Sequence, residues 1–242
     1  MGFAQTTVRL LMIYWLGVIS VSAAGKERTN SVDNDARDIA GRDMRNEWKL
    51  VKKKSGIQIY SKPAPRSPID AIRAEVVVDS RLNRLVSILY DPQLRPQWDE
   101  LCGESYVYEA VSSTEYLAYN HSKLPWPIKD RDMLARVIWS QDSETLKVLM
   151  QSTATADLMP RHKDRVRVIT ATESWELLPL DNGTVRLTLS LHADPAGPIP
   201  VWLINRLSVD SPYNILIGIR KLLESKKIEP REFDFIQEPE GA

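Results

Sequence analysis

Side chains that could act as nucleophiles, general bases or metal ligands are few in this sequence and lie far apart along it. The chain has one cysteine, Cys102, and three histidines, His121, His162 and His192. No pair of histidines has the helical spacing of metal ligands, and no cysteine or acidic cluster joins them. No base stands near Cys102, so a small buried thiol is the simpler interpretation. We therefore predict no catalytic residue, no metal site and no cofactor.

Acidic pairs such as Asp130 and Asp132 do occur, here in the stretch LPWPIKDRDML at 124–134. In a strand the two carboxylates would flank Arg131 from the opposite face, which is a poor arrangement for acid–base work on one substrate. The motifs G-x-S-x-G, G-x-G-x-x-G and the P-loop are absent from the sequence. The sequence thus contains no nucleophile–base constellation.

Overall charge argues against nucleic acid as a partner. The chain carries 32 basic and 32 acidic side chains, for a net charge of zero. A nucleic-acid-binding protein needs a basic face that displaces the counterions of the phosphates. We therefore predict no nucleic-acid partner.

The first 24 residues have the pattern of a secretory signal. Arg9 precedes an apolar run over residues 10–21, and small residues follow at Ser22, Ala23 and Ala24. The run of about 12 apolar residues is shorter than the ~20 that span a bilayer. We predict cleavage near Ala23 or Ala24, and the alternative is an uncleaved membrane anchor. Export without an internal disulfide indicates a bacterial protein that is periplasmic or secreted.

Removal of residues 1–24 from the 242-residue chain leaves 218 residues, enough for one domain with a sizeable core. We predict a flexible linker over 25–34, a single domain over 35–230 and a C-terminal tail over 231–242.

Hydrophobic periodicity predicts the elements of that domain. The first elements are a helix over 35–47, a β-hairpin over 48–63, a strand over 69–79 and a helix from Leu82 with Asp79 or Ser80 as N-cap. A short irregular or helical connection follows, to residue 102. The remaining elements are strands over 103–112, 114–122, 132–141, 144–153, 165–178 and 184–193, and a long helix over 201–227 that Pro212 should kink.

Short links between successive strands predict an antiparallel sheet, and the apolar stripe of the last helix should lie on its apolar face. The predicted fold class is therefore α+β, with a curved antiparallel sheet wrapped around a long C-terminal helix. Such a sheet tends to leave an internal hydrophobic cavity against the helix.

Six segments, in their order and spacing, resemble the START domain, the steroidogenic-acute-regulatory-protein-related lipid-transfer family. The resemblance runs from about residue 48 to residue 228 and is carried by SGIQIYSKP, AIRAEVVVDS, VSILYDPQLRPQWDE, LPWPIKDRDML, TESWELLPLDNGTVRLTLSLHADPAGPIPVWLINRL and SPYNILIGIRKLL. It implies a helix-grip fold and a hydrophobic tunnel that shields one lipid or sterol-like ligand. It also implies a lid made of the loops at one end and the C-terminal helix. We expect a monomer.

Candidate ligand-binding residues come from the inward faces of the strands and the last helix, together with the loops of the lid. They are Ile72, Ala74, Val76, Trp126, Arg131, Leu187, Leu189, Trp202, Ile204, Leu207, Ser208, Ser211, Ile215 and Ile219.

Two tryptophans lie beside prolines, Trp126 in LPWPIKD and Trp202 after DPAGPIP. We predict that both loops form a gate that opens at a membrane surface, with the indole rings in the headgroup region. Lys123 and Lys129 would add attraction to anionic lipid. The alternative is that both tryptophans are buried struts that close the domain.

Arg131 matches the arginine that follows this loop in the family. It would make a polar contact at the pocket, or a salt bridge to Asp99, Glu115 or Asp194 that anchors the strand.

The resulting function is non-catalytic binding, and transfer, of a lipid or other hydrophobic ligand. Burial of apolar area stabilises such a complex by ~25 cal/mol per Å², so no catalytic group is needed. One alternative is a cyclase or hydrolase of a hydrophobic substrate on the same fold. The other is an interaction module with a filled core.

Overall fold

The computed structural model describes residues 47–65, 67–155 and 158–240. The predicted signal sequence over 1–24, the linker over 25–34 and, apart from Glu47, the helix over 35–47 lie outside the described residues. The described elements are β1 (Lys49–Lys54), β2 (Ile57–Lys62), β3 (Ala71–Val78), α2 (Leu82–Tyr90), the 3-10 helix η1 (Pro92–Gln97), β4 (Cys102–Ala110), β5 (Glu115–Ser122), β6 (Asp130–Gln141), β7 (Val148–Ala154), β8 (Arg165–Arg167), β9 (Thr170–Pro179), β10 (Val185–Asp194) and α3 (Val201–Ser225).

The strands form one sheet in the order β1-β2-β3-β10-β9-β7-β6-β5-β4, and β8 pairs with β6. Every pair along this path is antiparallel, and the β6–β8 pair is parallel. Strands that follow one another in the chain pair within two groups, β1 to β3 and β4 to β10. The pairing of β3 with β10, which are far apart in the sequence, joins the two groups. This arrangement confirms the predicted antiparallel sheet.

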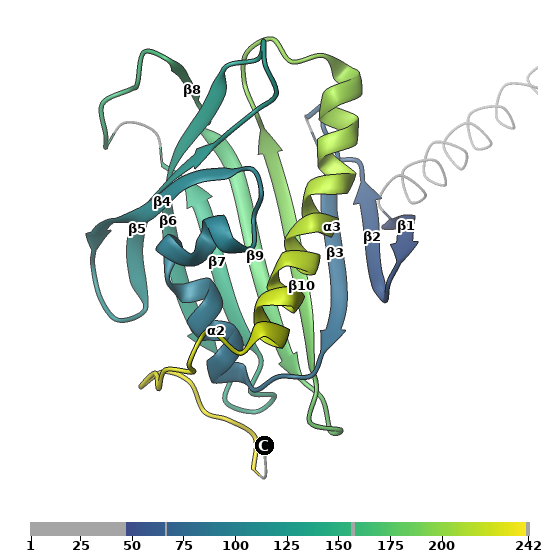
Figure 1. Ribbon diagram of the computed structural model, residues 1–242, viewed down its shortest axis with the longest axis vertical. Coiled ribbons are helices and arrows are strands. Elements are labelled where there is room, and N and C mark those ends of the chain that lie inside the picture. The colour runs from purple at the N-terminus through teal and green to yellow at the C-terminus, as the bar shows by residue number, and fades with distance from the viewer. Residues whose placement is uncertain (1–46, 66, 156–157, 241–242) are drawn as a thin grey trace, which may run out of the picture. The chain divides into compact units, whose positions relative to one another are not determined.

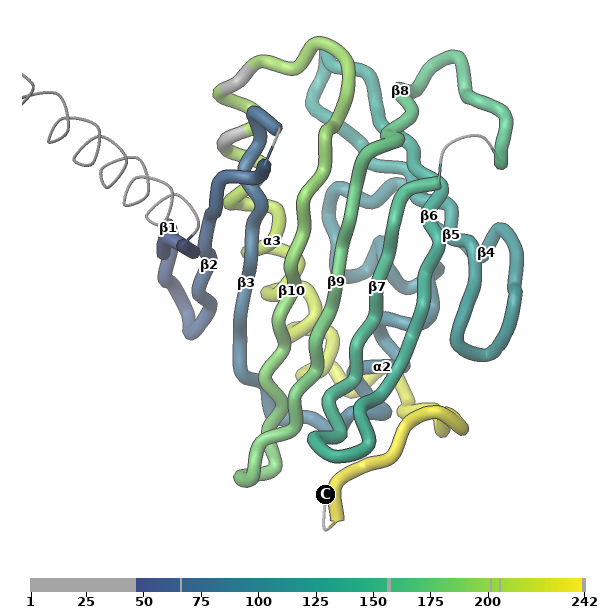
Figure 2. Tube along the Cα trace, turned by 180° about the vertical axis from the view of Figure 1, so that it is seen from behind, coloured from purple at the N-terminus to yellow at the C-terminus, as the bar shows by residue number. Residues whose placement is uncertain are grey.

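Alternating side chains give the sheet one apolar face. In β10, Val185, Leu187 and Leu189 are buried on the face toward α3, while Arg186 is exposed on the other face. Figure 1 shows α3 lying across the front of the sheet with α2 beside it. Figure 2 shows that the described part of the chain leaves the back of the sheet without helices. The predicted helix-grip fold is thus confirmed.

Helix α3 packs closely on η1 as well as on the sheet. Ile215, Leu216 and Ile219 are buried, and an ideal Cβ built on Gly218 would lie 2.3 Å from the carbonyl oxygen of Trp98. Only glycine lets the two backbones approach so closely. Helix α3 changes direction along its length in Figure 1, and Pro212 lies inside the helix.

Helix α2 is not capped as we predicted, because neither Asp79 nor Ser80 occupies its N-cap. The N-cap is Arg81, whose side chain makes no cap hydrogen bond. The carboxylate of Glu238 accepts from Leu82 N at 3.1 Å and from Asn83 N at 2.7 Å instead. A residue near the end of the chain therefore supplies the cap.

The segment after α3 folds back onto the domain. Phe233 and Phe235 stack around Tyr90, with ring centroids 5.0 and 6.1 Å from its ring. Gln237 and Gln141 are joined by two hydrogen bonds of 2.7 and 2.8 Å. Residues 231–240 thus complete the aromatic end of the core.

The predicted strand over 165–178 is two strands, which corrects the sequence interpretation. β8 runs beside the start of β6, and β9 lies between β7 and β10. Between β8 and β9 the chain therefore crosses from the side of β6 to the position between β7 and β10. Val168 N donates to Asp132 O at 2.8 Å where β8 ends.

Candidate functional site

A small pocket of about 30 Å³, which we call the cavity, lies between the inner face of the sheet and η1. It has room for a water-sized molecule and not for a lipid. The cavity is lined by Leu89, Pro92, Arg95, Trp98, Ser105, Tyr116, Ala118, Asn120, Val137, Met150, Ser152, Glu173 and Trp175.

One wall of this cavity is charged. The guanidinium of Arg95 lies 3.1 Å from Asp99 and 3.5 Å from Glu173, and Trp175 Nε1 donates to Glu173 at 2.7 Å. Burial alone would lower the pKa of Arg95, but Glu173 and Asp99 outweigh it and raise the pKa. Arg95 therefore stays charged, and the Arg95–Asp99–Glu173 cluster has one more negative than positive charge.

Neutral polar groups occupy other parts of the cavity wall. Ser105 Oγ donates to Asn120 Oδ1 at 2.8 Å. The indole nitrogen of Trp98 is buried without a hydrogen-bond partner among the described residues. An unpaired buried donor is costly unless a ligand or water satisfies it. The cavity can therefore satisfy a polar ligand group as well as an apolar one.

The predicted pocket residues of β3, β10 and α3 lie elsewhere on the inner face. Among them, Ile72, Ala74, Val76, Leu187, Leu189, Ile215 and Ile219 are buried in the core beneath α3, and Ile204, Leu207, Ser208 and Ser211 are half-buried. None of these residues lines the cavity in this conformation. The structure packs the first group together as core.

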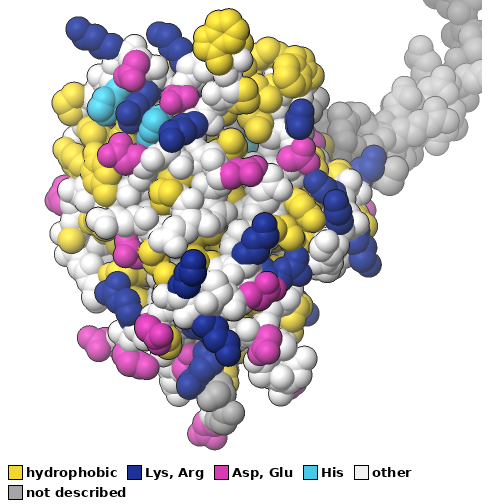
Figure 3. Space-filling model, in the orientation of Figure 1, with side chains coloured by type: hydrophobic (Ala, Val, Ile, Leu, Met, Phe, Trp, Pro, Cys, Tyr) yellow, Lys and Arg dark blue, Asp and Glu magenta, His cyan; other side chains and the backbone are white. Residues whose placement is uncertain are grey.

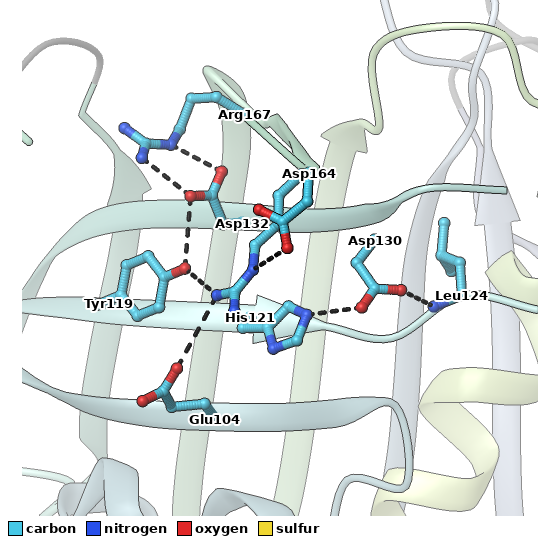
Figure 4. Close-up of polar contacts among 9 residues, drawn as sticks. Glu104, Tyr119, His121, Leu124, Asp130, Asp132, Asp164 and Arg167 are labelled. Carbon is cyan, nitrogen blue, oxygen red and sulfur yellow. Dashed lines mark hydrogen bonds and ion pairs between the residues drawn. The ribbon is translucent and has the colours of Figure 1, made fainter. Parts of the chain in front are cut away.

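Three consecutive residues at the start of β6 fix the loops at one end of the sheet. Asp130 holds the loop that precedes it: its carboxylate accepts from Leu124 N at 3.0 Å and pairs with His121 Nε2 at 2.8 Å (Figure 4). Hydrogen bonds from both groups help to lower the pKa of Asp130 against the opposing effect of burial.

Arg131 points to the opposite face and holds the loop between β10 and α3. Its guanidinium donates to the carbonyl oxygens of Pro195 at 3.0 Å, Ala196 at 2.7 Å and Lys129 at 2.5 Å. The side chain is 5% exposed, and this burial lowers its pKa. The hydrogen-bond partners of Arg131 are thus backbone carbonyls, and not the carboxylates of Asp99, Glu115 or Asp194.

Asp132 holds the segment that leads into β8. Its two oxygens accept from Arg167 at 2.9 Å each, and Tyr119 Oη donates to it at 3.4 Å (Figure 4). Arg165 donates in turn to Tyr119 Oη at 2.5 Å. Residues 130–132 therefore fix three different loops, which we call the tip loops: 123–129, 158–164 and 195–200.

A comparison with known proteins identifies the family. The START domain family matches residues 40–225. The chain belongs to the START domain family.

Relatives of this START domain span most of its length. A STAR-related lipid transfer protein from Xanthomonas axonopodis is 30% identical, with a TM-score of 0.67, over 73% of this chain and 98% of that one. Mouse phosphatidylcholine transfer protein is 26% identical over 74% of this chain and 85% of its own. Human StAR-related lipid transfer protein 5 has a TM-score of 0.69 at 17% identity, covering 83% of this chain and 98% of its own, and so supports the fold alone.

The two predicted gate tryptophans of this START domain are exposed, Trp126 by 92% and Trp202 by 64%. The alternative that they are buried struts is therefore wrong. Figure 3 shows hydrophobic side chains beside positively charged ones at the upper end of the molecule, where the tip loops lie.

The structure also bears on three other features among the described residues of this START domain: a reactive thiol, a metal site and a membrane-spanning helix. Burial raises the pKa of Cys102 to about 11, so its thiol is protonated and a poor nucleophile at neutral pH. Across residues 47–65, 67–155 and 158–240, no group of three or more acidic, histidine or cysteine side chains is placed to hold a metal ion. No helix within the same ranges is long and apolar enough to cross a membrane.

The Arg95–Asp99–Glu173 cluster was missed by sequence reasoning. Arg95 and Asp99 have the i,i+4 spacing of a helical ion pair, and this spacing inside a segment predicted as irregular or helical was the available signal. Glu173 lies 74 residues further along the chain than Asp99, and no local pattern indicates that it faces the same cavity.

Proposed function

We propose that the protein binds one phospholipid without catalysis and transfers it between membranes. The acyl chains would lie between the inner face of the sheet and α3, and the headgroup at the Arg95–Asp99–Glu173 cluster. The charged wall of the cavity carries this proposal, because a purely apolar ligand would offer no partner to its excess negative charge or to the unpaired indole N–H of Trp98.

The charges of the cluster favour a zwitterionic headgroup. Arg95 and the unpaired indole N–H of Trp98 suit phosphate oxygens. Glu173 and Asp99 suit a cationic amine. The ring of Trp98 already accepts a cation, because the guanidinium of Arg95 lies over it at 5.2 Å. Phosphatidylcholine fits this chemistry, and relatives that share 26–28% identity are named as phosphatidylcholine transfer proteins.

A phospholipid requires the cavity to expand. Helix α3 and the tip loops must therefore move away from the sheet and η1 while the lipid enters or leaves. We propose that this happens at a membrane, with Trp126 and Trp202 in the headgroup region and Lys123 and Lys129 near anionic lipid. We propose further that the protein acts outside the bacterial cytoplasm, which the signal-like pattern of residues 1–24 supports. We also propose that it acts as a monomer.

Native mass spectrometry of the full chain after incubation with mixed phospholipid vesicles tests the proposal. We expect one bound phospholipid per chain. Glu173→Gln keeps an oxygen for Trp175 Nε1 and removes the charge, so retention of phosphatidylcholine should fall roughly tenfold, within the range of one charge-assisted hydrogen bond.

Glu176→Gln is the matched control, because Glu176 lies on the same strand and pairs with Lys147 at 3.4 Å on the half-exposed outer face. Equal loss in both variants would contradict the assigned headgroup position. Turnover of an added hydrophobic ester would support an enzyme instead. A chain that never carries lipid would support an interaction module.

A further inference from the structure

A third loop lies at the same end of the molecule as the two loops that carry the tryptophans. β8 pairs in parallel with β6, with Arg165 opposite Asp130. Because the strands run the same way, the residues before Arg165 leave the sheet at the same end as the residues before Asp130. Residues 158–164 and residues 123–129 therefore precede their strands at the same end of the sheet (Figures 1 and 2).

The third loop is held in a defined position. Arg167, which pairs with Asp132, also donates to the carbonyl oxygens of Met159 at 3.2 Å and Pro160 at 3.1 Å. On the other side, Tyr108 Oη donates to Leu158 O at 3.3 Å. These contacts from β8 and β4 fix the backbone of the loop and leave its outward side chains to solvent.

Those outward side chains combine apolar and basic character. Leu158 is 58% exposed, and Lys163 is exposed next to a further cation, Arg161. Asp164, the acid within this loop, lies 3.9 Å from Arg165. The loop thus repeats the pairing of apolar and basic residues that Trp126 and its flanking lysines show.

The tip loops together are positively charged, although the whole chain is neutral. Within these loops the exposed cations are Lys123, Lys129, Arg161 and Lys163, and the exposed acid is Asp164. Positive charge arranged around exposed Trp and Leu side chains complements a bilayer with anionic headgroups, since the apolar groups enter the interface while the cations meet phosphates.

We infer that residues 158–164 form a third membrane contact, which selects bilayers containing anionic lipid through Lys163 and its neighbouring cation. This inference rests on the proposed membrane contact of the Trp126 and Trp202 loops and assigns the charge of the target surface. The lipid carried inside and the lipid recognised outside are then different: the cavity cluster suits a zwitterion, and the tip suits anionic neighbours.

Vesicle flotation of the full chain tests this inference, with phosphatidylcholine vesicles compared with vesicles that contain phosphatidylglycerol as well. We expect the wild-type chain to favour the anionic vesicles and to lose that preference at high salt. Lys163→Glu should weaken binding to anionic vesicles roughly tenfold and leave binding to neutral vesicles unchanged. Lys221→Glu, an exposed lysine of α3 away from the tip, should change neither.

Trp126→Ala separates this inference from the proposed function, because it should weaken binding to both kinds of vesicle. If Lys163→Glu and Lys221→Glu bind anionic vesicles as the wild-type chain does, the third contact is wrong while the proposed function stands. If the wild-type chain binds neither vesicle, membrane contact itself is wrong, and the third contact with it. Equal thermal unfolding of the variants shows that folding does not explain the differences.

Discussion

Gly218→Ala tests the contact that closes α3 over the cavity wall. The added Cβ would lie 2.3 Å from Trp98 O and 2.8 Å from Trp98 Cα, whereas ordinary contact begins at about 3.4 Å. The obstacle is backbone that cannot rotate away, so α3 and η1 must separate by about 1 Å. Overpacking of this kind destabilises by ~1–3 kcal/mol, and the better helix propensity of alanine returns about 1 kcal/mol.

We therefore expect a net loss of up to about 2 kcal/mol in the free energy of unfolding, and a Tm lower by up to ~8 °C for a domain of this size. Differential scanning calorimetry measures it, with Lys221→Ala at an exposed position of the same helix as control. If Gly218 does not contact Trp98 in solution, the higher helix propensity of alanine is the only effect, and the Tm rises by a few degrees. A rise would refute the close packing of α3 on Trp98. The same loosened contact should speed lipid exchange, which a fluorescent-phospholipid transfer assay measures.

Three further predictions concern charge, reactivity and capping. Burial alone would raise the pKa of Asp132, but Arg167 outweighs it and holds the pKa below its usual range. This carboxylate therefore stabilises the fold above pH ~4, and the effect is lost as the pH falls through the lowered pKa. Asp132→Asn should lower the Tm at pH 7, and the difference from the wild-type Tm should shrink as the pH falls through this range. Cys102, with a pKa of about 11, should react slowly with iodoacetamide at pH 8 until urea unfolds the chain, and rapid native labelling would contradict its burial. Glu238→Ala should lower the free energy of unfolding, measured by urea titration, by about 1 kcal/mol, because two backbone N–H groups of α2 lose their acceptor. The control Glu240→Ala, at an exposed position, should leave it unchanged. An equal loss of stability in both variants would exclude the cap.

Regular elements with a clear hydrophobic period were predictable from the sequence. The alternation of Val185, Leu187 and Leu189 gave the strand and its buried face, and the 3/4 spacing along residues 201–225 gave the long helix. The antiparallel topology followed from the short links between strands. These signals are local, because each depends only on residues near one another in the chain.

Interactions between distant residues were not predictable in this way. Glu238 caps a helix that begins 156 residues earlier. The partners of Arg131 are backbone carbonyls, which every residue carries and which leave no pattern in a sequence. The division of 165–178 into β8 and β9 depends on β6 lying alongside, which only the folded chain provides.

The pairing of β3 with β10 sets when this domain can complete its fold during translation. Ile72 lies opposite Leu191, so on a nascent chain β3 has no β10 partner until more than a hundred further residues have been made. Its apolar face has no cover until α3 follows, and α2 has no cap until Glu238 has been made. A message truncated before α3 would therefore yield a sheet with an exposed apolar face and a strong tendency to aggregate.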